Sequence, residues 1–118
     1  MTRSKLFFAS TLFVLGSYAF GEGPDCSGGW PTTMTLVHLK NAGMTDNEKV
    51  DSAKTKTTRM ASEKIGKDLY HQVYDVQYTE KSGKLIEAIA VHNASSEECS
   101  MTGVEVFVVS KHLNDKFN

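Results

Sequence analysis

The sequence predicts an α+β fold that is mainly an antiparallel β-sheet, with one or two short N-terminal helices and one disulfide bond. Three observations support this prediction. Three runs of apolar and β-branched residues, separated by short connections, follow one another in the C-terminal half. The N-terminal half has a proline followed, one helix length later, by a glycine. Only two cysteines occur in the 118 residues, as expected for one disulfide bond in an exported domain.

The beginning of the chain has the pattern of an export signal. Arg3 and Lys5 form a short positive segment before an apolar run at residues 6–15. That run is too short to cross a bilayer, which takes roughly 20 apolar residues. Small residues suit cleavage near residues 19–21, and an N-terminal core element is the alternative. The expected organisation is a signal peptide at residues 1–19 and a single domain at residues 20–118.

Charge and composition exclude two classes of partner. Without Arg3 and Lys5 the chain has 11 basic residues against 14 acidic ones, and no basic block remains. Nucleic acids and anionic membrane surfaces attract basic patches, so neither is expected as a partner. The residues before Cys26 do not form the small-residue box of a lipid-modified cysteine, so we expect a soluble product.

Cys26 and Cys99 are expected to form a disulfide that closes a loop of about 73 residues. A loop of this length stabilises the fold by about 4 kcal/mol in the chain-entropy model. The alternative is a reactive thiol at Cys99, which would need a paired base and reducing surroundings. The disulfide would tie the connection before the last strand to the N-terminal end of the exported domain.

The segment at residues 32–41 is ambiguous between strand and helix. Its β-branched content favours a strand, whereas Pro31 at a first helical position and the stop at residues 41–43 favour a helix. We favour the helix. After it, Thr45 is a possible N-cap with Glu48 three residues later, which predicts a further turn or two of helix.

Residues 52–66 alternate loosely and are rich in threonine and lysine, which predicts a polar strand at the edge of a sheet. An amphipathic helix is the alternative. A turn at residues 80–83 ends in a glycine and joins two of the strands that follow. The expected antiparallel meander consists of residues 69–79, 84–93 and 102–111.

Both faces of this meander are apolar. In the last strand, Val104, Val106 and Val108 share one face, with Phe107 and Val109 on the other. A sheet with one wet face alternates more cleanly than this. We expect the helix and the threonine-rich strand to cover part of the second face, and a second copy of the chain to cover the remainder as a homodimer.

The sequence has no pattern of a catalytic or metal site. Its four histidines make no H-x-H or H-x-x-x-H pair, and no cysteine has zinc-ligand spacing. No G-x-S-x-G motif occurs, and adjacent carboxylates in a loop usually point apart. We therefore expect no enzyme, no metal and no cofactor. An Asn-Ala-Ser triplet at residues 93–95 matters only in a cell that glycosylates exported proteins.

The feature that points to function is an acidic connection at residues 95–100, next to Cys99. A loop held rigid by a disulfide binds at low entropic cost, and an acidic loop suits a cationic cleft such as that of a cell-wall hydrolase. We expect a protein partner. The candidate contacts are Glu97, Glu98, Ser96, Trp30 and the hairpin tip around Glu80.

An alternative function is a small-ligand or metal-binding protein. Such a protein would use the histidines and a face of tyrosines, although these tyrosines also fit a core or an interface. The residues concerned are His38, His71, His92, His112, Tyr70, Tyr74 and Tyr78.

Two segments resemble a known family: TKTTRMASEKIGKDLYHQVYDV at residues 55–76 and NASSEECSMTGVEVFVVSKHL at residues 93–113. With the bacterial type of export signal, they are similar to the periplasmic immunity proteins of type VI secretion systems, among them inhibitors of lysozyme-like VgrG effector domains. The resemblance implies a periplasmic, non-enzymatic and homodimeric protein that plugs the cleft of a peptidoglycan-hydrolysing effector from sibling cells. It carries over no site residue, because such families share no catalytic motif.

Overall fold

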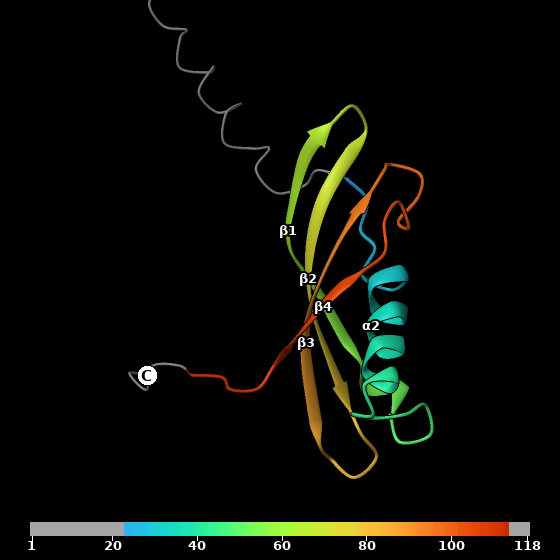
Figure 1. The fold of residues 1–118 in the computed structure, drawn as a ribbon, viewed down its shortest axis with the longest axis vertical. Helices are drawn as coiled ribbons and strands as arrows, with labels where there is room; N and C mark the ends of the chain where they lie inside the picture. The colour runs from blue at the N-terminus through green and yellow to red at the C-terminus, as the bar shows by residue number, and fades with distance from the viewer. Residues whose placement is uncertain (1–22, 114–118) are drawn as a thin grey trace, which may run out of the picture.

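The computed structural model describes residues 23–113, so the expected signal peptide lies outside the described residues. One four-stranded antiparallel sheet, in the order β1-β2-β3-β4, has a helix packed on one face (Figure 1). The mainly antiparallel fold with a helix and one disulfide is therefore confirmed. The elements are α2 (Trp30–Asn41), a 3-10 turn η2 (Ser52–Lys54), β1 (Lys56–Gly66), β2 (Leu69–Thr79), β3 (Leu85–Ala94) and β4 (Glu105–Val109).

Helix α2 confirms the helical reading of the ambiguous N-terminal segment. Pro31 lies in its first turn, where a missing N–H costs nothing. The helix ends where Gly43 adopts φ +75°, a left-handed conformation that favours glycine. The N–H of Met44 then donates to the carbonyl of Leu39. Leu39 is 1 % exposed and fixes the helix against the sheet.

The second short helix expected after Thr45 is not formed, and that prediction was wrong. The Thr45 hydroxyl donates to Glu80 Oε2 at 2.8 Å and so caps no helix. Asp46 instead accepts the backbone N–H groups of Glu48 and Lys49 at 2.9 and 3.1 Å. A short turn results because the buried carboxylate of Glu80 competes for the threonine.

The predicted strands are all present, but three of the four differ from the predicted bounds: the polar strand begins at Lys56 after the turn η2, β3 is shifted by one residue to Leu85–Ala94, and the last strand is shorter. The polar edge strand is confirmed as β1, and β2 has the predicted bounds. β4 is Glu105–Val109, whereas residues 102–111 were predicted. Thr102 is occupied elsewhere: its Oγ1 accepts the N–H of Asn93 at 2.9 Å, and its carbonyl accepts the indole N–H of Trp30 at 3.0 Å. Its polar groups are therefore unavailable to the β3–β4 ladder.

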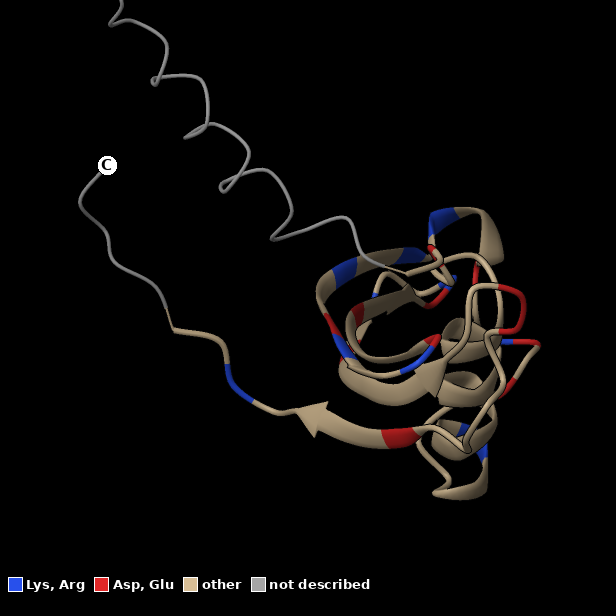
Figure 2. Ribbon diagram, turned by 90° about the horizontal axis from the view of Figure 1, so that it is seen from above, with Lys and Arg blue, Asp and Glu red and all other residues tan. Residues whose placement is uncertain are grey.

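The core lies between α2 and one face of the sheet. Figure 2 shows the sheet curving, with the helix on its inner side. The buried sheet residues alternate along β2 and β3, as period two requires. The largest apolar contributors are Tyr74, Val76, Tyr78, Ile86, Ala88 and Ala90. No helix among the described residues is long and apolar enough to cross a membrane.

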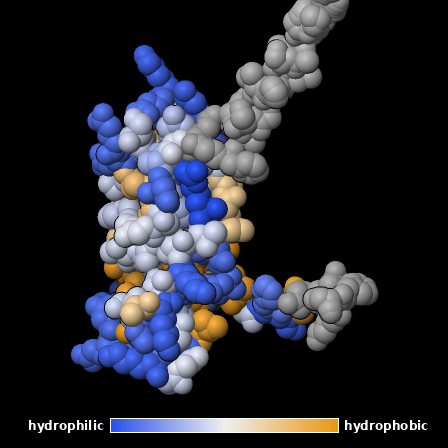
Figure 3. Space-filling view, turned by 180° about the vertical axis from the view of Figure 1, so that it is seen from behind, coloured by the Kyte–Doolittle hydropathy of each residue, from blue (hydrophilic) through white to orange (hydrophobic). Residues whose placement is uncertain are grey.

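The opposite face of the sheet, called here the open face, is not covered by α2, and residues 110–112 line a pocket on it together with Gln77 and Glu87. β1 lies within the sheet, and α2 packs only against the inner face, so the expectation that these elements cover the second face was wrong. From behind, hydrophilic atoms cover most of the surface and hydrophobic atoms gather across the middle and lower parts (Figure 3). The open face of β2, β3 and β4 presents Val73, Asp75, Gln77, Glu87, Ile89, Val91, Phe107 and Val109.

Candidate binding surface

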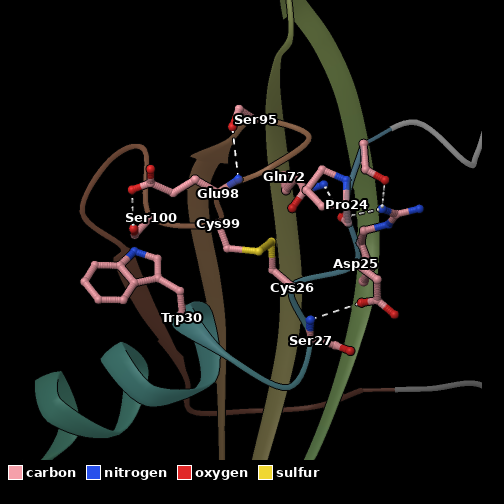
Figure 4. The surroundings of a disulfide bond; sticks show 12 residues. Pro24, Asp25, Cys26, Ser27, Trp30, Gln72, Ser95, Glu98, Cys99 and Ser100 are labelled. Carbon is pink, nitrogen blue, oxygen red and sulfur yellow. Dashed lines mark hydrogen bonds between the residues drawn. A yellow bond between two sulfur atoms is a disulfide. The ribbon is translucent and has the colours of Figure 1, made fainter.

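The predicted disulfide joins Cys26 to Cys99 across 73 residues of sequence, with Cα atoms 5.9 Å apart (Figure 4). Cys26 is 2 % exposed, and no free cysteine is present. The bond attaches the segment before α2 to the loop between β3 and β4. Because Cys99 is joined to Cys26, it has no free thiol, so this structure contradicts the alternative of a reactive Cys99.

A buried hydrogen-bond network fixes the N-terminal side of the disulfide. The Cys26 N–H donates to Tyr74 Oη at 2.9 Å, and that hydroxyl donates to Gln72 Oε1 at 2.7 Å. The amide group of Gln72 donates to the carbonyl of Pro24 at 2.8 Å. Burial raises the pKa of the Tyr74 phenol, so it stays protonated and keeps its donor role. The network holds Cys26 against β2.

The acidic loop, residues 95–100, is also closed by its own hydrogen bonds. The Ser95 N–H donates to the Glu98 carbonyl at 2.8 Å, and Ser95 Oγ accepts the Glu98 N–H at 3.0 Å. The Ser100 hydroxyl donates to Glu98 Oε2 at 2.8 Å. Glu97 is exposed, and its carboxylate has no partner among the described residues. The loop thus presents Glu97 outward from a fixed backbone.

Asp68, at the tip of the β1–β2 hairpin, is a positioning residue that sequence reasoning missed. Its two carboxylate oxygens accept the N–H and the hydroxyl of Ser96, each at 3.0 Å. Asp68 has φ +56°, a conformation that aspartate tolerates better than most residues. An aspartate within the two-residue connection between Gly66 and Leu69 was the available signal, but only the fold brings it to Ser96.

Trp30 supports the other side of the loop. Its indole N–H donates to the carbonyl of Thr102, and its half-buried ring packs against the core near Cys99. Figure 4 shows the ring next to Ser100, on the same side as the disulfide. The Trp30 ring therefore packs beside the disulfide.

Most of the expected contact residues lie together at one end of the sheet. Ser96, Glu97 and Glu98 directly precede Cys99 in the chain, and Glu98 and Trp30 lie beside the disulfide in Figure 4. Glu80 is far from them, at the β2–β3 turn, where it is only 8 % exposed and bonded to Thr45. The structure therefore does not bring Glu80 to the acidic loop, and its carboxylate is not free for a partner.

The residues of the alternative ligand-binding function do not converge. His38 is exposed on α2, His71 Nδ1 lies 2.7 Å from Asn93 Oδ1, and His92 is buried with its ring centroid 5.6 Å from that of Tyr74. Within residues 23–113, no group of three or more His, Cys, Asp or Glu side chains could hold a metal ion. Tyr74 and Tyr78 are core residues under α2.

A separate open groove of about 350 Å³ lies between α2 and the segment before β1. Leu36, Val37 and Val50 make its lining largely apolar, and Lys40 is its single charged residue. The Tyr78 hydroxyl on its wall donates to the Thr32 carbonyl. The groove offers an apolar surface without converging polar groups.

Comparison of the chain with protein-family models, with curated proteins and with solved structures finds no significant match. The surface is therefore interpreted from its own geometry. This geometry provides a fixed, anionic loop at one end of a sheet, whose cysteine is joined to Cys26 in a disulfide.

Proposed function

We propose that this protein is a periplasmic immunity protein of a type VI secretion system. It binds the active-site cleft of a peptidoglycan-hydrolysing, lysozyme-like effector and blocks it. The observation that supports this function best is the acidic loop, which the disulfide and Asp68 hold directly and which Trp30 holds at Thr102, two residues after the loop ends.

Rigidity favours inhibition because a preorganised loop loses little conformational entropy on binding. Three attachments separate the loop from an ordinary mobile connection, and each reaches a different part of the fold. A loop of this kind can occupy a cleft without being reshaped by it.

Charge favours the same class of partner. Glu97 and Glu98 are exposed at the loop tip, and Asp68 adds a third carboxylate close by. Enzymes that cleave an anionic polymer commonly have cationic clefts, and complementary charge accelerates association and sets its register. The loop would enter the cleft and exclude the glycan chain.

The test is a binding and lysis assay with the cell-wall hydrolases exported by the same strain. The purified protein should capture one hydrolase and abolish its lytic activity on peptidoglycan. The double variant Glu97→Ala/Glu98→Ala should bind it about tenfold or more weakly while melting at the same temperature. Glu48→Ala is the matched control, since Glu48 is an exposed glutamate at the other end of the sheet near Glu80.

The proposal fails if the wild-type protein leaves the lytic activity of every such hydrolase unchanged. It also fails if the loop variant and the Glu48→Ala control inhibit equally well. In that case the inhibitory surface lies elsewhere, and the acidic loop is a structural connection.

A further inference from the structure

The tip of the β1–β2 hairpin, residues 63–68, is exposed along its whole length. Tyr70 of β2 pairs with Ala94, the last residue of β3, so the connection at Lys67 and Asp68 lies past the end of β3. Figure 1 shows this tip extending beyond the loop between β3 and β4. The tip therefore has the shape of an element that enters a concave partner.

The tip also carries an apolar side chain that the core does not use. Ile65 is 49 % exposed and lies outside the core cluster. Lys64 pairs with Tyr70 and Gly66 with Leu69, which leaves Ile65 as the extra residue of a β-bulge. Bulges redirect a side chain and are frequent beside functional sites. The bulge thus leaves Ile65 available for contact at the projecting end of the hairpin.

Opposite charges flank the contact that joins the tip to the acidic loop. Asp68 accepts two hydrogen bonds from Ser96, and Lys67 directly precedes Asp68 while Glu97 directly follows Ser96. Both charged side chains are exposed, and neither has a hydrogen-bond or ion-pair partner among residues 23–113. Because this contact fixes the two backbones, an ammonium group and a carboxylate are presented together to a partner.

We propose that the hairpin tip enters the active-site cleft of the effector beside the acidic loop, where the Lys67 ammonium group pairs with the catalytic carboxyl groups. Ile65 packs against the wall of the cleft next to them. This inference rests on the proposed function and names the contact that stops catalysis.

The chemistry of glycan cleavage explains why an ammonium group fits there. Most such enzymes have two carboxyl groups at the scissile bond, and one of them is protonated to act as the general acid. An ammonium group beside it stabilises the ionised form, which lowers the pKa of the general acid and removes the proton that it needs. Lys67 would therefore block acid catalysis as well as occupy the cleft, while the acidic loop binds cationic groups on the wall.

The surrounding charges oppose the other class of partner that lysines attract, a polyanion such as a nucleic acid or an anionic membrane surface. Polyanions bind basic patches, whereas exposed carboxylates outnumber exposed ammonium groups at this end of the sheet. The acids are Glu63, Asp68, Glu97 and Glu98, and the lysines are Lys64 and Lys67. This pattern fits a protein site in which carboxyl groups lie next to cationic ones.

The test uses the hydrolase that the protein captures and inhibits in the assay above. Lys67→Ala should bind it about tenfold more weakly, and Lys67→Glu more weakly still, because it places a like charge beside carboxyl groups. Lys81→Glu is the matched control, since Lys81 is an exposed lysine in the β2–β3 turn at the other end of the sheet. All three variants should melt at the wild-type temperature, because these side chains are exposed.

A double-mutant cycle identifies the groups that Lys67 contacts. Each catalytic carboxyl group of the hydrolase is replaced by the corresponding amide, and calorimetry gives the affinity of each form for the wild-type protein, Lys67→Ala and Glu97→Ala. Lys67→Ala should lose its effect on at least one amide form, whereas Glu97→Ala should weaken binding to every form alike.

Two results overturn the inference while the proposed function stands. In the first, Lys67→Ala weakens binding to all forms of the hydrolase equally. In the second, Lys67→Glu binds and inhibits the hydrolase as well as the wild-type protein does. If the wild-type protein inhibits no hydrolase, the proposed function fails and this inference fails with it.

Discussion

On the inner face of the sheet, Tyr74, Val76, Ala88 and Ala90 are fully buried, whereas on the open face Val73, Ile89 and Val91 keep part of their surface in water. The polar groups differ in the same way. On the inner face, Gln72 and Tyr74 are built into a closed hydrogen-bond network. On the open face, Asp75 faces Glu87 with one oxygen unbonded. The comparison shows that the buried contacts that stabilise the fold are on the inner face, while the open face and the β4 edge are left available for association.

The titratable groups of the two faces respond to pH in opposite directions. His92 is buried on the inner face, and this burial lowers its pKa. Asp75 is on the open face, where burial and the neighbouring Glu87 raise its pKa to about 6. Protonation of His92 in acid therefore lowers the free energy of unfolding, whereas protonation of Asp75 raises it.

Removing the disulfide should have the largest effect on the inner face. Cys26→Ala/Cys99→Ala releases a loop whose ends are 73 residues apart, so the free energy of unfolding should fall by about 4 kcal/mol. Urea denaturation of both proteins measures the difference. A change below about 1 kcal/mol would show that the Tyr74 and Asp68 contacts hold the two segments without the bond.

The next largest effect should come from the buried network. Tyr74→Phe leaves the Cys26 N–H and Gln72 Oε1 buried without their partner, which should cost about 1–3 kcal/mol. Tyr70→Phe is the matched control, because Tyr70 is half-buried and its hydroxyl makes no hydrogen bond within the described residues. Equal stability of the two variants would contradict the role of the network.

His92 should make the inner face sensitive to acid. Its folded pKa is below the usual 6.5, so the unfolded chain binds the proton more tightly. The stability of the fold should therefore be complete above about pH 6.5 and fall as the pH drops below it. Thermal melting at several pH values should show this loss in the wild-type protein and a smaller loss in His92→Phe. A parallel decline in both would assign the acid sensitivity to other groups.

The smallest effect is expected on the open face. The folded pKa of Asp75 is above its usual 3.8, so its contribution to stability is present below that pH and is lost as the pH rises through about 6. Asp75→Asn should therefore stabilise the protein at neutral pH by about 1–2 kcal/mol and have no effect in acid. Denaturation at the two pH values measures this. Glu87→Gln should give part of the same gain, because it removes the neighbouring charge.

Local patterns were sufficient for much of the fold. The period-two spacing of Tyr74, Val76 and Tyr78 placed β2 correctly, and Pro31 with the glycine stop placed α2. The two cysteines of the chain left one pairing, which the structure confirms. These features depend on neighbouring residues or on a count, so no knowledge of the fold was needed.

The errors arose where distant residues compete for the same polar group. Thr45 was a reasonable helix cap until the fold brought Glu80 to its hydroxyl. The last strand loses its first residues because Trp30 and Asn93 both bond to Thr102. Asp68 could not be assigned to the acidic loop, because only the β1–β2 hairpin brings it to Ser96. Sequence reasoning therefore found the loop and its disulfide but not the contact with Asp68.

The position of the disulfide along the chain also sets the order in which the protein can be completed during its synthesis. Cys26 is made early, but its partner follows 73 residues later, after the whole of β1, β2 and β3. Until Cys99 has emerged, the first cysteine must remain a thiol or pair with another molecule. The presence of the Cys26–Cys99 bond in a growing chain therefore shows that the first three strands have already been made.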